Sequence, residues 1–178
     1  MELSAQIPDK NIHNNIEDPV SIPGNVPEGI PENMLEHIIF SERIPDIGAY
    51  NELRVRSGKD NGIDPEMADR AIHNSLYLVS AYDGDKLIGL GRVVGDGAVT
   101  FAVTDIMVDR AYQNHGVGDR IMDHIENYLD GVSDEHSFIM LIARIPSDHL
   151  YRRHRFEYLQ EGYRTGMIRN QSHLKSEG

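Results

Sequence analysis

The pattern of apolar and polar positions divides this chain into segments with two different periods. Between Leu76 and Val108, short runs rich in apolar and β-branched residues are separated by glycine- and aspartate-containing turns at 83–85 and 95–97. Such turns between short apolar runs are typical of antiparallel hairpins. We therefore expect three successive antiparallel strands, over Leu76–Tyr82, Lys86–Val94 and Ala98–Val108.

Helical spacing occurs on both sides of these strands. After them, apolar residues recur every four positions, which predicts a helix packed by one face, with Gly131 as its stop. The recurring residues are Val117, Ile121, Ile125 and Leu129. Before the strands, helices are expected over Asp46–Arg56 and Pro65–Asn74, the second with Asp64 as its cap.

The remaining segments complete a pattern of the α/β or α+β class. They are expected to form a first strand at Leu35–Ser41, a buried strand at Ser137–Ala143, a short helix at Ser147–His154 and one or two closing strands within Phe156–Ile168.

Composition indicates one domain. At 178 residues and 39% hydrophobic content the chain can bury one core but not two. We place the domain at 34–170, between a proline-rich arm at 1–33, extended and either mobile or laid against the domain or a partner subunit, and a polar tail at 171–178. No apolar run reaches the length of a membrane span, and the N-terminus lacks a secretory signal, so we expect a cytoplasmic protein without a membrane partner.

The charge and the absence of cysteine exclude several functions. A formal net charge of −12 argues against a nucleic-acid partner and mildly favours a cationic acceptor such as an amine, although acidity also serves solubility alone. Without cysteine, disulfides, thiolate metal sites and a cysteinyl acyl-enzyme are excluded. The nine histidines form no His-Glu-x-x-His pattern, so no metal site is expected.

The strongest candidate for chemistry is Gln113-Asn-His-Gly-Val-Gly118, which joins the third strand to the following helix. Glycine lets an anion approach the backbone, and the first N–H groups of a helix attract negative charge. The segment therefore predicts a phosphate cradle. Taken alone, a tight turn that requires glycine would show the same pattern.

Together with the apolar strand before it and the aromatic segment Leu150-Tyr-Arg-Arg-His-Arg-Phe156, this cradle resembles that of the GNAT superfamily of acetyl-CoA-dependent N-acetyltransferases. The family signature is Gln/Arg-x-x-Gly-x-Gly/Ala, and the resemblance extends from about Pro45 to Arg169. It implies the GNAT fold, a mixed and mostly antiparallel sheet with a splayed central strand pair, flanked by helices.

The resemblance also implies how acetyl-CoA, the co-substrate, is held. Backbone groups of Ile106, Met107 and Val108 would hold the pantetheine, on a strand that commonly carries a β-bulge. The pyrophosphate would bind to Gln113, Asn114, His115, Gly116, Val117, Gly118 and Asp119. Asp119 would repel it unless this side chain points away or pairs with Arg120.

For catalysis, Tyr151 matches the family tyrosine that protonates the departing thiolate, although Arg155 replaces the glycine usual before Phe156. Asp105 is a candidate general base, with a carboxylate bonded to backbone N–H groups at the bulge as the alternative. By the resemblance, Glu52 and Glu66 lie on helices that line the acceptor site and are candidates for holding the amine.

The sequence therefore predicts an N-acetyltransferase that moves acetyl directly to a primary amine of a small molecule or a protein, with a homodimer possible. A catalytically inactive GNAT-fold protein that binds acyl-CoA, as a sensor or interaction module, is the alternative. A third candidate is an α+β interaction domain without a cofactor.

Overall fold

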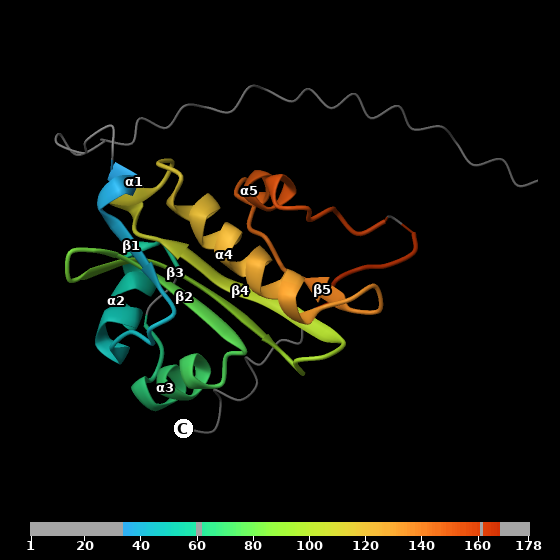
Figure 1. Cartoon of the computed structure of the whole chain (residues 1–178), viewed down its shortest axis with the longest axis horizontal. Helices are drawn as coiled ribbons and strands as arrows, with labels where there is room; N and C mark the ends of the chain where they lie inside the picture. The colour runs from blue at the N-terminus through green and yellow to red at the C-terminus, as the bar shows by residue number, and fades with distance from the viewer. Residues whose placement is uncertain (1–33, 60–61, 161, 168–178) are drawn as a thin grey trace, which may run out of the picture.

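A computed structural model describes residues 34–59, 62–160 and 162–167 of the chain. Its core is a sheet in which the strands follow one another in chain order, antiparallel from β1 to β4 and parallel between β4 and β5 (Figure 1). The strands are β1 (Ile38–Ser41), β2 (Tyr77–Asp83), β3 (Lys86–Gly95), β4 (Thr100–Val108) and β5 (Phe138–Met140). This mixed sheet flanked by helices confirms the expected fold class.

Helices pack on both faces of the sheet (Figure 1). They are α1 (Met34–His37), α2 (Ile47–Arg56), α3 (Pro65–His73), α4 (Val117–Val132), α5 (Asp148–Arg153) and the 3₁₀ turn η1 (Arg110–Tyr112). The expected early helices are confirmed, because Asp46 and Asp64 cap them by accepting hydrogen bonds from the N–H groups of Ala49 and Met67.

The sheet separates two cores. On one face α2 and α3 bury Leu53 and Ile72 against Leu90. On the other face α4 buries Ile121 and Ile125 against β2, β3 and β4. A Cβ on Gly91 would lie 2.6 Å from Ile121 Cγ2, so only glycine lets α4 approach β3 this closely.

The central strand β4 carries the expected β-bulge. Between the pairs Leu90–Met107 and Arg92–Thr104, one residue of β3 faces two residues of β4. Asp105 lies at this irregularity with φ +52°, which is unusual for a residue other than glycine. The bulge reorients the end of the strand.

The extra residue changes which side chains face each core. Before the bulge, Val103 packs into the core under α4, whereas after it Ile106 and Val108 contact that core and Met107 points to the α2–α3 side. Pairing with β5 ends at Ala102 of β4. The backbone of β4 from 104 to 108 is therefore left without a β5 partner, which is the splayed strand pair that was expected.

Four local predictions were wrong. Residues 35–37 belong to α1 and not to the first strand, and α4 passes Gly131 and ends at Val132. The expected buried strand at 137–143 forms only over Phe138–Met140, whose side chains are half-buried or exposed. No closing strand forms within 156–160 and 162–167, the part of that segment that is described.

The closing strands are missing for a physical reason. A strand is fixed in register when one of its faces is buried, but Tyr158, Leu159, Tyr163 and Met167 are all exposed. Helix α4 continues past Gly131, because the Ser133 N–H bonds to the Leu129 carbonyl and closes the last turn of the helix.

The arm at 1–33, Ile168 and the tail at 171–178 lie outside the described residues. Among the described residues, no helix is long and apolar enough to cross a membrane.

Candidate functional site

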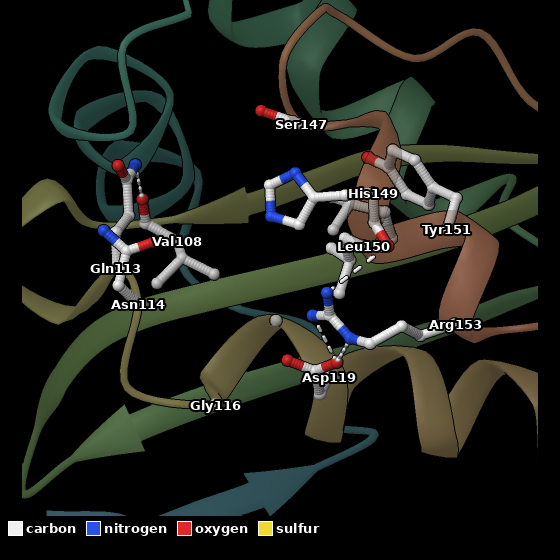
Figure 2. Close-up of a pocket in the computed structure, with 12 residues that line it drawn as sticks. Val108, Gln113, Asn114, Gly116, Asp119, Ser147, His149, Leu150, Tyr151 and Arg153 are labelled. Atoms are coloured by element: carbon white, nitrogen blue, oxygen red, sulfur yellow. Dashed lines mark hydrogen bonds and ion pairs between the residues drawn. The ribbon is translucent and has the colours of Figure 1, made fainter. Parts of the chain in front are cut away.

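Two cavities adjoin at the splayed end of β4. The first has a volume of about 390 Å³ and lies between the start of α4 and α5 (Figure 2). The second, of about 740 Å³, lies beside the bulge and the end of α2. Both are lined by Ile106, Val108, Gln113, Ser147 and Tyr151. A molecule in one cavity can therefore contact a molecule in the other.

The predicted cradle forms one wall of the first cavity. Gly116, with φ +81°, is the N-cap of α4, and no side chain caps that helix. The first N–H groups of α4 therefore lack a side-chain acceptor and are available to an anion. The cradle residues that line the cavity are Gln113, Asn114, Gly116, Gly118 and Asp119.

Two predicted cradle side chains do not line the cavity. Val117 is buried in the core under α4. His115 Nδ1 lies 2.6 Å from the Gln113 carbonyl oxygen, a contact within the turn itself. Any role of these two residues in anion binding would therefore belong to their backbone.

The negative charge of Asp119 has a partner, but it is not Arg120. Arg153 donates two hydrogen bonds to Asp119 Oδ1, at 3.0 and 2.7 Å, as Figure 2 shows. Arg120 instead lies 3.7 Å from Asp123. Since Arg153 lines the first cavity, it offsets the repulsion between Asp119 and an incoming phosphate.

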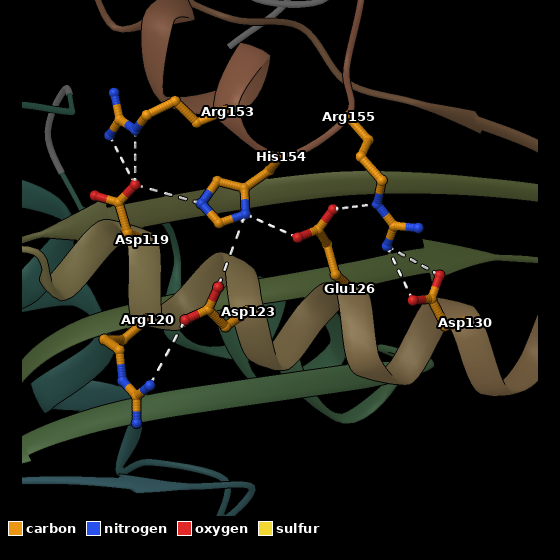
Figure 3. A network of polar contacts seen from close by, with 8 residues as sticks. All are labelled: Asp119, Arg120, Asp123, Glu126, Asp130, Arg153, His154 and Arg155. Atoms are coloured by element: carbon orange, nitrogen blue, oxygen red, sulfur yellow. Dashed lines mark hydrogen bonds and ion pairs between the residues drawn. The ribbon is translucent and has the colours of Figure 1, made fainter.

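Asp119 belongs to a larger set of ion pairs that joins α4 to α5, here named the α4–α5 clasp (Figure 3). Its members are Asp119, Asp123, Glu126 and Asp130 of α4, and Arg153, His154 and Arg155. His154 is buried, and its Nδ1 lies 2.9 Å from Glu126 Oε2. Burial raises the pKa of Glu126, but hydrogen bonds with His154 and Arg155 outweigh it and lower that pKa. The clasp holds α5 against α4.

Arg155 adopts the left-handed conformation that glycine usually provides, with φ +61°. Its guanidinium bonds to Glu126 at 2.8 Å and to Asp130 at 2.9 and 3.0 Å. The replacement of glycine has therefore not removed the turn, and Tyr151 on α5 remains beside the cavities.

Tyr151 lies at the junction of the two cavities, and Figure 2 shows its side chain among the residues that line the first of them. Its ring contacts Phe156 edge to face, with centroids 6.5 Å apart. Burial raises the pKa of the phenol above its usual value of 10.0. Tyr151 therefore keeps its proton at neutral pH and can donate it.

Asp105 lies at the wall of the second cavity in a cluster of cations. Its carboxylate accepts hydrogen bonds from the Tyr50 hydroxyl and Arg92 Nε, both at 2.8 Å, and from Lys59 and Arg54. Burial raises its pKa, but Lys59, Arg92 and Tyr50 lower it more, to about 2. The hydrogen bonds described for this carboxylate come from side chains and not from the backbone of the bulge.

The structure does not bring Glu52 or Glu66 to either cavity. The Glu52 side chain is 73% exposed and pairs with Arg56 at 3.0 Å. Glu66 is an exposed residue in the first turn of α3. Both face solvent because they lie on the outer sides of their helices.

Four cationic residues of the second cavity were missed by the sequence analysis. They are Arg54, Lys59, Arg92 and Arg144. They come from α2, the loop after it, β3 and the segment after β5. Because they come from four different segments, no local motif predicts that they lie together. Three of them, Arg54, Lys59 and Arg92, pair with the same carboxylate, so these three cations and Asp105 together carry a formal charge of +2.

Comparison with known proteins identifies the family. A model of the acetyltransferase (GNAT) domain matches residues 48–172. The chain belongs to the GNAT acetyltransferase family. It is therefore an acyltransferase, and the family uses acyl-CoA as donor. No curated protein matches the chain.

Solved structures of GNAT acetyltransferases share this fold. A protein of unknown function from meticillin-resistant Staphylococcus aureus, described as a probable acetyltransferase, is 37% identical with a TM-score of 0.70 over 75% of this chain and 98% of its own. A GNAT-family acetyltransferase from Streptococcus pneumoniae is 31% identical with a TM-score of 0.60, over 76% and 97%. The ribosomal-protein-S18-alanine N-acetyltransferase of Escherichia coli, at 17% identity and a TM-score of 0.57 over 69% and 79%, shares the fold alone.

The first cavity fits the diphosphate of an acyl-CoA. A Cβ at Gly118 would meet Leu150 at 3.4 Å, so larger side chains there would occupy the space between α4 and α5. The uncapped start of α4 and the Arg153 guanidinium supply donors for anionic oxygens on this wall.

Proposed function

We propose that this GNAT acetyltransferase moves acetyl from acetyl-CoA to the primary amine of a small molecule or a protein. The observation that carries the proposal is the junction of the two cavities at Tyr151. A cofactor in the first cavity can present its acetyl group at this junction to an amine in the second. With no cysteine in the chain, the transfer is direct.

The first cavity would bind the cofactor at two points. The segment 113–119 would hold the diphosphate through the N–H groups at the start of α4, with Gly116 and Gly118 allowing close approach. The backbone of Ile106–Val108, free of β5, would hold the pantetheine arm. Acetyl-CoA supplies the activated thioester. Fixing a long molecule at two points limits where its acetyl group lies.

Tyr151 is our candidate for the general acid. The leaving group is a thiolate, and a phenol whose pKa is raised by burial stays protonated until that thiolate accepts its proton. Among the predicted site residues, Tyr151 is the proton donor that lines both cavities.

The attacking amine must be neutral, and the second cavity favours this form. Nearby positive charges disfavour an ammonium ion and lower the pKa of an amine. Asp105, with a pKa of about 2, is a poor proton acceptor. We therefore propose that water accepts the proton of the amine. Asp105 would instead position Arg54, Lys59 and Arg92.

Calorimetric titration with acetyl-CoA, 3′-dephospho-CoA and pantetheine tests the cofactor assignment. The first two keep the diphosphate and should bind, whereas pantetheine should bind much more weakly. Equal affinity for all three would exclude the cradle as the diphosphate site.

Thiol release over a panel of primary amines then tests the transfer. We expect release above the amine-free rate, with an acetylated amine as product. Tight binding of acetyl-CoA without release for any amine would exclude the proposed transfer and leave an acyl-CoA-binding sensor.

A further inference from the structure

Among the described residues, the wall of the second cavity holds a cluster of cations around one carboxylate, Asp105. Arg54, Lys59 and Arg92 all contact Asp105, so three cations share a single negative charge. The exposed fractions of these three side chains are 17%, 28% and 11%. Holding like charges together away from water is unfavourable unless an anion joins them.

Arg92 and Arg54 are held in position by further hydrogen bonds. Arg92 Nη1 donates to the Ala71 carbonyl at 2.7 Å and to Ser75 Oγ at 3.0 Å, while its Nε bonds to Asp105. Arg54 Nη1 bonds to the Tyr50 hydroxyl, and its buried Nε has no partner among the described residues. A positively charged wall that is organised before binding loses little freedom when it binds an anion.

The rest of the chain does not share this charge. The formal net charge is −12, so the formal +2 of Arg54, Lys59, Arg92 and Asp105 together opposes the overall field. An amine that carries only positive charge would therefore be attracted to the protein at long range but repelled inside this cavity. The volume of about 740 Å³ is in the range of small-molecule sites.

We infer that the acceptor carries an anionic oxygen group, a carboxylate or a phosphate, near its amine, and that Arg54, Lys59 and Arg92 bind this group. The inference rests on the proposed acetyl transfer to an amine in the second cavity. The anion would anchor the acceptor, while the same positive charges keep its amino group neutral for attack.

Matched acceptor pairs test the inference. One pair is an α-amino acid and its α-carboxamide, and the other is O-phosphoethanolamine and ethanolamine. Thiol release at saturating acetyl-CoA should give a kcat/KM roughly 10- to 100-fold higher for the anionic member of one pair, mainly through KM. The pair that responds identifies the group as carboxylate or phosphate.

Substitutions of Lys59 test whether the cation cluster causes the preference for an anionic acceptor. Lys59→Gln should reduce the preference for the anionic acceptor, and Lys59→Arg should restore most of it. Lys86→Gln is the matched control, because Lys86 lines neither cavity and pairs with Asp109. This control should keep the full preference.

A second readout separates this inference from the proposed function. Calorimetry with protein saturated with CoA should show binding of the anionic acceptor and much weaker binding of its neutral partner. Equal kcat/KM for both members of both pairs would overturn the inference while leaving acetyl transfer intact. Selective binding without any thiol release would overturn the transfer and keep the anion site.

Discussion

The first and second cavities share a wall but are built in different ways. The first is formed largely by one continuous segment, 113–119, together with α5, and its candidate ligands are mostly backbone groups. The second is formed by side chains from α2, β3, β4 and the segment after β5, and charge dominates its wall. A backbone cradle recognises any diphosphate, whereas a set of side chains selects among acceptors. On the proposed assignment, backbone groups would bind the donor and side chains would select the acceptor.

The β4 bulge connects the two parts. It places Ile106 and Val108 where both cavities meet, and it places Asp105 among the cations of the second. Changes on one side of the bulge should affect donor binding, and changes on the other side should affect the acceptor or the stability of the cation cluster.

The largest expected effect is on the donor side. Gly118→Trp would place a large ring against Leu150 and Val108, the nearest side chains to a Cβ at this position. We expect the affinity for acetyl-CoA, measured by calorimetry, to fall by roughly 100-fold or more.

Gly118→Ala is the control, since its Cβ would make only ordinary contact with Leu150 at 3.4 Å. It should keep affinity within a few-fold of the parent chain. Unchanged affinity in a folded Gly118→Trp variant would remove the cradle assignment. Gly116→Glu should also block binding, but it adds backbone strain at φ +81°.

At the junction, Tyr151→Phe should affect turnover and not binding. We expect kcat at saturating acetyl-CoA to fall roughly 10- to 1,000-fold, as on losing a general acid, with acetyl-CoA affinity within a few-fold of the parent. The ring that contacts Phe156 is retained, so a packing role would preserve both. Full kcat across the pH range would show that Tyr151 does not donate the proton.

On the acceptor side, Asp105→Asn should destabilise the fold, because it leaves three cations without their shared carboxylate. We expect the free energy of unfolding at pH 7, from denaturant titration, to fall by about 3 kcal/mol. Asp85→Asn, in the exposed β2–β3 turn, should change it by less than about 0.5 kcal/mol.

This stabilisation has a predictable pH range. The folded pKa of Asp105, about 2, is below the unfolded value of about 3.9, so the contribution is complete above pH 4 and is lost as the pH falls through 2. Asp105→Asn should remove this part of the acid dependence. Equal stability of the two chains at pH 7 would show that the cluster does not depend on Asp105.

The smallest effect is expected at the Arg155 end of the α4–α5 clasp, where Arg155, Glu126 and Asp130 line neither cavity. Arg155→Gly removes ion pairs with Glu126 and Asp130 but relieves a left-handed backbone, so we expect a change in unfolding free energy within about 1 kcal/mol. Arg155→Ala loses the pairs and keeps the strain, and should be less stable than Arg155→Gly. The reverse order would show that strain at Arg155 is negligible.

The sequence predicted the elements that local chemistry determines. Asp46 and Asp64 cap the helices that follow them, and the glycines of the cradle fall at the start of α4. The closing strands were wrongly predicted. Aromatic residues such as Tyr158 and Tyr163 favour strands, but here their side chains are exposed and do not fix a strand against the sheet.

The cation cluster could not be predicted, for a different reason. Arg54 and Arg92 are 38 positions apart in the sequence, and only the packing of α2 on the sheet brings both to Asp105. For the same reason the sequence gives no sign that Asp105 is surrounded by cations, or that Asp119 pairs with Arg153 and not with Arg120.

The acetyl-CoA dissociation constant, measured by calorimetry in the parent chain, Gly118→Trp and Lys59→Gln, tests the division between the two cavities most directly. The account predicts loss of binding in Gly118→Trp and an affinity within a few-fold of the parent in Lys59→Gln, whose side chain lines only the second cavity. Equal weakening by both substitutions, or by neither, would contradict it.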